Sequence, residues 1–248
     1  MNEYLSMIIL GLVQGITEFL PVSSSGHLVL LEKSGIGEPG VMNNLLLHCA
    51  TLLVVLIVYG KDVVRIVRHP TSKESLFLIA ASVPTAVCAG LIRYLLPDTT
   101  DYLPLFFIVT SVVLLLPSLF PDSKFDFEKK RTAKALFVGA MQGVACFAGV
   151  SRSGTTASAL LLSGCPKEEV SRYSFLLSIP IIVGSSAVEL FTSSQSTLSL
   201  AVIPGFVVAF FSGFFSLKLF SRVLEKNNLY LFSAYTFLIA VFSFFRLF

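Results

Sequence analysis

Long apolar stretches separated by short polar segments run along the whole chain, a pattern that predicts a bundle of membrane-spanning helices. A helix needs about 20 mostly apolar residues to cross the hydrocarbon core of a bilayer. Six stretches have this length and are bounded by charged or turn-forming residues. The predicted spans are residues 41–60, 75–96, 102–120, 171–191, 198–220 and 229–247.

Two further apolar stretches, residues 5–30 and 133–165, are each interrupted midway by glycine, serine and other polar residues. Irregular backbone at membrane depth is tolerated only where it is buried in protein or lines a wet cavity. Both stretches are therefore predicted to be re-entrant helical hairpins, which enter the membrane and leave it on the same side.

The two interrupted stretches also match each other when the sequence is shifted by 128 residues. The shift pairs GLVQGITEFLPVSSSGH, from Gly11, with GAMQGVACFAGVSRSGT, from Gly139, and eight of these 17 positions are identical. The identical pairs include Gln14 with Gln142, Ser23 with Ser151, Ser25 with Ser153 and Gly26 with Gly154. So dense a match within short polar motifs indicates an internal duplication.

The duplication divides one membrane domain, residues 1–248, into halves at residues 1–120 and 133–248, joined by a cytoplasmic linker at residues 121–132. Each half contains one hairpin followed by three spans. Because three is an odd number of crossings, the second half lies upside down relative to the first, as in an inverted repeat. The predicted fold is an all-α polytopic membrane protein whose two hairpins enter from opposite faces and meet near the midplane.

The composition supports a membrane protein, because 54% of the residues are hydrophobic and 13% are charged, whereas soluble domains carry about 25% charged residues. The net charge of +3 is too small to indicate a nucleic-acid partner. With Arg152 set aside in the second hairpin, the predicted topology leaves only Lys33, Arg93 and Arg246 on one side of the membrane. The side rich in Lys and Arg is the cytoplasm by the positive-inside rule, so both termini face outward.

Almost all of the polar side chains at membrane depth belong to the two hairpins. The first carries Gln14, Glu18, Ser23, Ser24, Ser25 and His27, and the second carries Gln142, Ser151, Arg152, Ser153, Thr155 and Thr156. Gln14 and Glu18 are four residues apart, so they project from one helix face and can share a ligand. A carboxylate and a guanidinium inside a membrane are costly and usually mark a functional site. The alternative is an ion pair between Glu18 and Arg152 that only locks the hairpins together.

The segment VSRSGTT, which begins at Val150, combines a guanidinium with hydroxyls and backbone N–H groups beside a glycine. These groups bind phosphate, especially where a helix begins. His27 can then act as a general acid, general base or nucleophile in cleaving a phosphate ester or anhydride. The alternative for His27 is a hydrogen-bonded core histidine. His48 and His69 lack such neighbours in the sequence, so no role is assigned to either.

With these motifs the sequence resembles the undecaprenyl-diphosphate phosphatases, the bacitracin-resistance family that recycles the lipid carrier of bacterial cell-wall synthesis. The family's first motif, E/Q-x-x-x-E followed by P-V-S-S-[ST]-G-H, is similar to QGITEFLPVSSSGH from Gln14. Its second motif, P-G-x-S-R-S-x-x-T, is similar to GVSRSGTT from Gly149. The resemblance covers the chain end to end. Gln14 occupies the first acidic position, a variant that the family admits, and Ala148 replaces the proline before Gly149.

The resemblance implies an integral membrane phosphatase of the bacterial cytoplasmic membrane, with a site open toward the outer face. It implies that Glu18, His27, Ser24 and Arg152 are catalytic, with Ser24 at a position proposed as the nucleophile. The phosphate groups of the lipid substrate are expected to contact Gln14, Ser23, Ser25, Ser151, Arg152, Ser153 and Thr156. The family also implies a divalent cation, Mg²⁺ or Ca²⁺, and Glu18 is the only carboxylate of the motif that can bind it.

The residues and the resemblance lead to one hypothesis, the cleavage of undecaprenyl diphosphate to the monophosphate and inorganic phosphate. Arg152 holds the terminal phosphate, and His27 activates either Ser24 or a water for attack. A flippase or transporter of a phosphorylated prenyl lipid is the alternative, because transporters use the same architecture. A second membrane phosphatase class needs a later H-x-x-x-D motif and is excluded, since no histidine follows His69. The sequence leaves open the nucleophile and whether the chain forms a homodimer.

Overall fold

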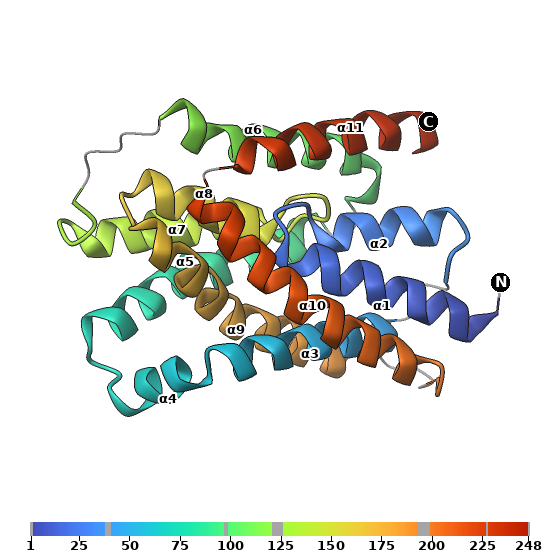
Figure 1. The fold of residues 1–248 in the computed structure, drawn as a ribbon, viewed down its shortest axis with the longest axis horizontal. Coiled ribbons are helices and arrows are strands. Elements are labelled where there is room, and N and C mark those ends of the chain that lie inside the picture. The colour runs from blue at the N-terminus through green and yellow to red at the C-terminus, as the bar shows by residue number, and fades with distance from the viewer. Residues whose placement is uncertain are drawn as a thin grey trace.

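The computed structural model describes residues 2–37, 41–96, 99–120, 126–192, 199–226 and 228–247. Every regular element within these ranges is helical (Figure 1). The α-helices are α1 (Glu3–Phe19), α2 (Ser24–Lys33), α3 (Val41–Val58), α4 (Gly60–Arg68), α5 (Lys73–Leu95), α6 (Leu103–Leu119), α7 (Arg131–Val144), α8 (Arg152–Leu162), α9 (Lys167–Thr192), α10 (Val202–Glu225) and α11 (Leu229–Leu247). A short 3-10 helix, Thr100–Tyr102, precedes α6. Residues 121–125 of the predicted linker and residue 198 of a predicted span lie outside the described residues.

Each of the two interrupted stretches folds as a pair of helices, as predicted from its polar break. In the first pair, α1 ends at Phe19 because Pro21 follows, and the residue before a proline is biased toward an extended backbone. Leu20 has this conformation, with a ψ of 148°, and Ser23 begins α2 with a φ of 69°. In the second pair, residues 145–151 join α7 to α8, and the turn needs Gly149 at a φ of 98°. The predicted breaks within residues 5–30 and 133–165 are confirmed.

Five helices, α5, α6, α9, α10 and α11, are long and apolar enough to cross a membrane. A sixth candidate is the pair α3 and α4, which is bent by 76° between its two parts. The span predicted over residues 41–60 is therefore broken near its end. The break lies where Gly60 follows Tyr59, because a glycine lowers the steric cost of an abrupt change in direction. The prediction of an all-helical chain with many membrane-crossing segments is confirmed.

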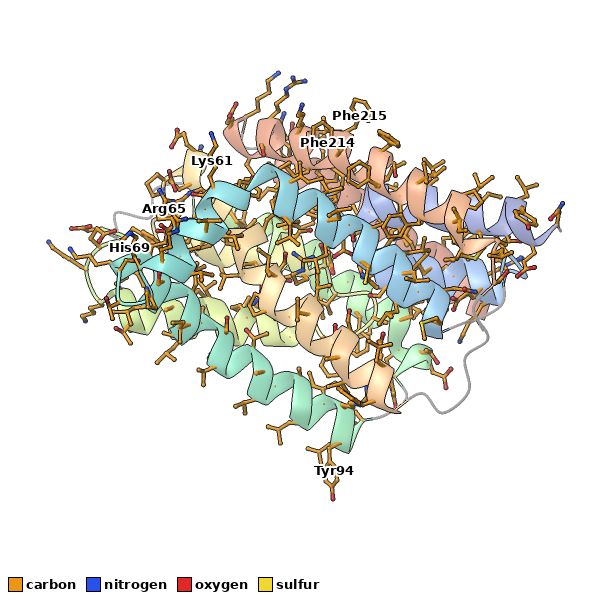
Figure 2. The ribbon with its side chains drawn as sticks, turned by 90° about the horizontal axis from the view of Figure 1, so that it is seen from below. Lys61, Arg65, His69, Tyr94, Phe214 and Phe215 are labelled. Carbon is orange, nitrogen blue, oxygen red and sulfur yellow. The ribbon has the colours of Figure 1, made fainter. Side chains whose placement is uncertain are left out.

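The surface of the helix bundle is rich in large apolar side chains, which suits contact with lipid rather than water. Phe215 on α10 is 69% exposed and Tyr94 at the end of α5 is 85% exposed, and Figure 2 shows both projecting away from the helices. The interior instead holds many small hydroxyl residues. Ser111 on α6, for example, donates a hydrogen bond to the backbone carbonyl of Ser233 on α11 at 2.9 Å. Such interhelical hydrogen bonds are typical of helices packed within a membrane.

Glycines bring the first helix of each hairpin very close to a long helix from the other half of the chain. On α1, a Cβ added at Gly11 would collide with the backbone of Gly205 on α10. On α7, a Cβ added at Gly139 would collide with the backbone of Ala81 on α5. Small residues allow such close backbone packing. Figure 1 shows α10 lying across α1, in agreement with this close packing.

Candidate active site at the hairpin tips

The two hairpin tips contact each other through serine side chains and backbone groups. Ser23 Oγ accepts a hydrogen bond from its own helix at Gly26 N, at 3.3 Å, and another from the second hairpin at Gly149 N, at 3.1 Å. Ser153 Oγ of the second tip donates to Leu20 O of the first, at 3.1 Å. The predicted meeting of the two tips is confirmed, and it places the beginnings of α2 and α8 beside each other.

The serines that begin α2 and α8 have the same local role, as the duplication predicts. Ser23 caps α2 by accepting from Gly26 N, and Ser151 caps α8 by accepting from Gly154 N at 3.1 Å. The cap satisfies one of the free N–H groups at a helix start. Ser151 is also anchored from α6, because its backbone N–H donates to Thr110 Oγ1 at 2.9 Å.

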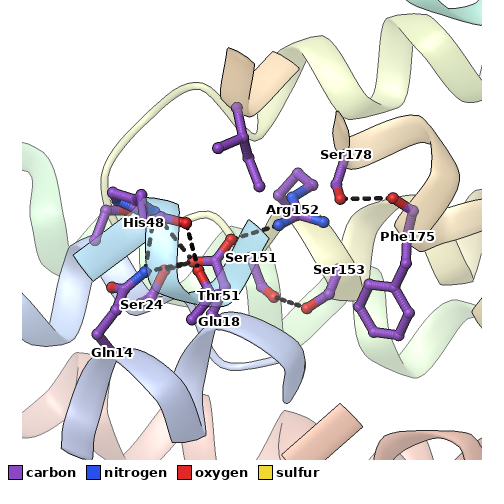
Figure 3. A network of polar contacts seen from close by, with 12 residues as sticks. Gln14, Glu18, Ser24, His48, Thr51, Ser151, Arg152, Ser153, Phe175 and Ser178 are labelled. Atoms are coloured by element: carbon purple, nitrogen blue, oxygen red, sulfur yellow. Dashed lines mark hydrogen bonds and ion pairs between the residues drawn. The ribbon is translucent and has the colours of Figure 1, made fainter. Parts of the chain in front are cut away.

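A buried ion pair joins the hairpins at the centre of the site. Arg152 Nη2 donates to Glu18 Oε1 at 2.5 Å, and only 6% of the Glu18 side chain and 14% of the Arg152 side chain are exposed (Figure 3). The other terminal nitrogen, Arg152 Nη1, is buried and has no hydrogen-bond partner among the described residues. Since a buried charged donor without a partner is costly, Nη1 is available for an anion that enters the site.

The second oxygen of the Glu18 carboxylate accepts two hydrogen bonds from the first hairpin. Ser24 Oγ donates to Glu18 Oε2 at 2.6 Å, and Gln14 Nε2 donates to the same oxygen at 3.1 Å. Gln14 and Glu18 therefore share one helix face, as their spacing predicts. Ser24 is half-buried in the first turn of α2, so its hydroxyl links the Glu18 carboxylate to the beginning of that helix.

His48 on α3 also belongs to this cluster, although no role follows for it from the sequence. Its Nδ1 lies 2.9 Å from Gln14 Nε2 and 3.6 Å from Glu18 Oε2. The His48 side chain is 30% exposed, so it lies at the edge of the site. An ionisable residue within an apolar span is itself a signal of function, and that signal could have identified His48.

The hydrogen bonds of His27 are with Ser23 and Tyr235, whereas a direct role in activating Ser24 would require a contact with that serine. Its Nδ1 lies 2.7 Å from Ser23 O, and since a carbonyl can only accept, Nδ1 carries a hydrogen. The neutral ring then accepts through Nε2 from the Tyr235 hydroxyl, at 2.8 Å. The two rings are stacked, with centroids 5.8 Å apart. No feature of the sequence around Tyr235 pointed to this contact.

Three further residues that the motifs predict as phosphate ligands use their hydroxyls for contacts within the protein. Thr156 Oγ1 lies 2.8 Å from Arg152 O and 3.2 Å from Gln142 Oε1. Ser25 Oγ lies 3.4 Å from Ser23 Oγ, and Ser153 Oγ lies 3.3 Å from Ser151 Oγ. These hydroxyls hold the tips in shape, and their contact with a phosphate stays a prediction.

The oxygen atoms near Glu18 are suited to a divalent cation that is held mostly by its substrate. No group of three or more His, Cys, Asp or Glu residues gathers anywhere in the described part of the chain, so an all-protein metal cage is not formed there. Mg²⁺, however, often uses one or two protein oxygens together with water and phosphate oxygens. Glu18 supplies a carboxylate, and Gln14 Oε1 is a buried carbonyl oxygen without a partner among the described residues. These donors fit Mg²⁺ or Ca²⁺.

The arrangement can bind a phosphate group and move a proton in one place. The beginnings of two helices and a free guanidinium nitrogen favour an anion at the tips. A serine hydroxyl in contact with a buried carboxylate can act as a nucleophile beside its base. Together these groups favour phosphoryl transfer from a substrate that reaches the tips.

Comparisons with known proteins show that the chain is similar to enzymes named as diphosphatases. Residues 7–242 match the model of a protein family described as "Bacitracin resistance protein BacA". The chain is 38% identical to the undecaprenyl-diphosphatase of Carboxydothermus hydrogenoformans, over 97% of this chain and 96% of that protein. It is 37% identical to the undecaprenyl-diphosphatase of Thermosipho melanesiensis, over 96% of this chain and 97% of that protein. The identity to the undecaprenyl-diphosphatase of Methanosphaera stadtmanae is 31%, over 97% of each chain.

Proposed function

The chain belongs to the bacitracin resistance protein family, and on this basis we propose that it is a membrane enzyme that hydrolyses undecaprenyl diphosphate to undecaprenyl monophosphate and inorganic phosphate. It is a multi-pass membrane protein, which suits a lipid substrate that lies in the same bilayer. Removal of the terminal phosphate would regenerate the lipid carrier that is used in cell-wall synthesis. The same reaction is associated with bacitracin resistance in the family.

The observation that carries this proposal is the free guanidinium nitrogen beside two helix beginnings. Arg152 Nη2 is held by Glu18, while Nη1 is buried without a partner among the described residues. A guanidinium can hold two phosphate oxygens at once, and helix beginnings favour anions. The terminal phosphate of the substrate is therefore assigned to Arg152, at the start of α8.

We assign the role of nucleophile to Ser24 and that of its base to Glu18. When Arg152 turns to the phosphate, the Glu18 carboxylate is free to take the proton that Ser24 Oγ already shares with it at 2.6 Å. Ser24 Oγ attacks the terminal phosphorus, and the bond between this phosphorus and the bridging oxygen breaks. The lipid monophosphate leaves, and water then hydrolyses the phosphoserine to release inorganic phosphate.

His27 is assigned to the second step rather than to the activation of Ser24. Its Nε2 accepts from the Tyr235 hydroxyl, whereas Ser24 donates to Glu18. Once the Tyr235 hydroxyl moves aside, Nε2 can take a proton from the attacking water. The Nδ1 contact with Ser23 O keeps the ring oriented during this transfer.

The divalent cation of the family, Mg²⁺ or Ca²⁺, would be held by the Glu18 carboxylate and by Gln14 Oε1. When bound, such a cation neutralises charge on the diphosphate and on the leaving group. The orphaned carbonyl oxygen of Gln14 supports this assignment. The protein supplies few ligands because the phosphates supply the others.

We further propose that residues 1–120 and 133–248 form an inverted repeat within one membrane domain. The exchange of partners between the halves supports it, because α1 of the first half packs on α10 and α7 of the second half packs on α5. With α3 and α4 taken as one span, each half has a hairpin and three spans, and six cross the bacterial cytoplasmic membrane. The charge distribution supports an orientation with both termini on the outer face, and membership of the family supports a site that opens on the same face.

Phosphate release from long-chain prenyl diphosphates by the detergent-purified protein tests the proposed activity. We expect release that depends on Mg²⁺ or Ca²⁺, loss of release in Arg152→Ala, and unchanged release in Arg246→Ala, a matched control at the exposed end of α11. Failure of the folded wild-type protein to release phosphate at any chain length would reject the enzyme. Movement of the lipid across liposomes without phosphate release would then establish the flippase.

The orientation is tested by labelling a single cysteine in a variant that lacks the four native cysteines. A Lys129→Cys substitution places the cysteine at an exposed position before α7. We expect it to react with a membrane-impermeant reagent only from the cytoplasmic side. Labelling from the outer side of intact cells would contradict the proposed topology.

A further inference from the structure

The two hydrogens of the Gln14 amide are both used inside the site (Figure 3). Nε2 donates one to Glu18 Oε2 at 3.1 Å, and His48 Nδ1 lies 2.9 Å from the same nitrogen. Nδ1 accepts the second hydrogen in the neutral tautomer that carries the ring hydrogen on Nε2. If the amide were turned over, Gln14 Oε1 would face a carboxylate oxygen, which is repulsive, and in this tautomer of His48 it would also face a ring nitrogen lone pair. The two acceptors therefore fix the orientation of the amide.

The fixed orientation leaves Gln14 Oε1 without a partner. The oxygen is buried, and no described residue donates a hydrogen bond to it. Buried polar atoms are almost always paired in folded proteins, and each exception needs an explanation such as an ion or a ligand. The Glu18 carboxylate lies on the same helix face, so a cation near one of these groups can reach the other.

The duplicated half of the chain provides an internal comparison. Gln142 occupies on α7 the position that Gln14 occupies on α1. Its Nε2 donates to Thr85 Oγ1 at 3.2 Å, and its Oε1 accepts from Thr156 Oγ1 at 3.2 Å. The Gln142 amide, which has no carboxylate beside it, therefore has hydrogen-bond partners for both its nitrogen and its oxygen. Of these two corresponding amides, only the one next to Glu18 has a carbonyl oxygen without a partner among the described residues.

We propose that His48 is a positioning residue that holds Gln14 with Oε1 free as an oxygen ligand for the divalent cation of the diphosphate substrate. This inference rests on the proposed function. His48 itself does not touch the cation, because its Nδ1 is occupied by Gln14 Nε2. A carboxylate at position 14 would present an oxygen to the cation in either orientation. An amide presents its oxygen only when a neighbouring residue orients it, and His48 does this for Gln14.

The test compares two substitutions of His48 with different hydrogen-bonding capacity. In His48→Asn, Oδ1 occupies the place of Nδ1 and still accepts, whereas His48→Leu has similar bulk and no acceptor. Binding of Mn²⁺ is followed by electron paramagnetic resonance in the presence of farnesyl methylenediphosphonate, which cannot be hydrolysed. Loss of a residue that orients a metal ligand weakens binding by about tenfold to a hundredfold. We expect this loss in His48→Leu, near-wild-type binding in His48→Asn, and no change in His69→Leu, the matched control in an exposed loop.

A double substitution shows whether His48 acts through Gln14. Gln14→Met keeps the length of the side chain and removes both amide atoms, so it should weaken Mn²⁺ binding as much as His48→Leu does. The double variant should then bind no worse than Gln14→Met, because the two residues form one unit. In activity assays, raising the Mg²⁺ concentration should restore the kcat of His48→Leu. Damage to the fold would not be reversed in this way.

Several outcomes would overturn the inference. These are unchanged Mn²⁺ binding in His48→Leu, equal losses in His48→Asn and His48→Leu, additive losses in the double variant, or no Mn²⁺ binding by the wild-type protein. Phosphate release from farnesyl diphosphate by the same wild-type preparation is measured in parallel. Its absence would reject the proposed function, whereas normal release together with unchanged binding in His48→Leu would reject only the role of His48.

Discussion

Glu18 and Arg152 form an ion pair although 134 positions separate them in the chain. Each belongs to a different hairpin, and both side chains are largely buried. A buried charge that loses its partner is strongly destabilising, because little water remains to solvate it. The contact between the hairpins and the electrostatics of the site therefore depend on the same two residues. A phosphate that attracts Arg152 acts directly on the group that holds the hairpins together.

Separate removal of the two charges distinguishes a catalytic pair from a structural lock. Arg152→Met leaves the Glu18 carboxylate buried without a partner, so we expect the free energy of unfolding to fall by about 3–5 kcal/mol. Glu18→Leu with Arg152→Met removes both charges and should recover most of that loss. Neither variant should release phosphate. The checks are thermal unfolding followed by circular dichroism and phosphate release; an active double variant would mean that the pair only locks the hairpins.

Ser24 provides a test of the serine route. Ser24→Ala removes the hydroxyl that donates to Glu18 Oε2 and should lower kcat by about a thousandfold or more, as expected for loss of a nucleophile. Ser185→Ala is the matched control, because this serine bonds only within its own helix at Ile182 O. Acid quenching with a ³²P-labelled diphosphate should trap phosphate on the wild-type protein and not on Ser24→Ala. Full activity in Ser24→Ala would leave water as the nucleophile.

Tyr235 provides a test of the orientation of His27. Tyr235→Phe keeps the stacked ring and removes the hydroxyl that donates to His27 Nε2. The hydroxyl has to leave Nε2 before the ring can take a proton from water, and one hydrogen bond contributes about 0.5–1.5 kcal/mol, so kcat should rise by about twofold to tenfold with little change in KM. Tyr230→Phe, on an exposed part of the same helix, should have no effect. A slower enzyme after Tyr235→Phe would instead mean that the hydroxyl orients His27 for catalysis.

The hairpins and the centre of the site follow from the sequence, because short-range signals specify them. Glycine, serine and proline break the apolar runs, and the spacing of Gln14 and Glu18 already places them on one face. The duplication then predicts that the tips meet, and the sequence allows an ion pair between Glu18 and Arg152 as the alternative to a functional site. These features depend on backbone conformation and helix periodicity, which residues close together in the sequence determine.

His48 and Tyr235 could not be placed in the same way, because tertiary packing brings them to the site. His48 reaches Gln14 only because α3 packs beside α1, and Tyr235 reaches His27 only because α11 lies along α6. The bend between α3 and α4 was also missed, since the apolar run continues to Tyr59 and Gly60 is its only local signal. Hydropathy measures whether a segment can cross a membrane and not which neighbour it meets.

The close contact between α1 and α10 gives a last prediction, because it links packing to catalysis. A Cβ at Gly11 would collide with the backbone of Gly205, so Gly11→Ala should push α1 away and lower stability by about 1–3 kcal/mol. Gly184→Ala is the matched control on α9: its Cβ would meet nothing within 4 Å, and the gain in helix propensity is worth up to about 1 kcal/mol. Since the chain contains no tryptophan, thermal unfolding is followed by circular dichroism. Below its unfolding temperature, Gly11→Ala should also lose activity, because α1 carries Glu18 toward Arg152. Unchanged stability and activity would show that the two helices do not need this close contact.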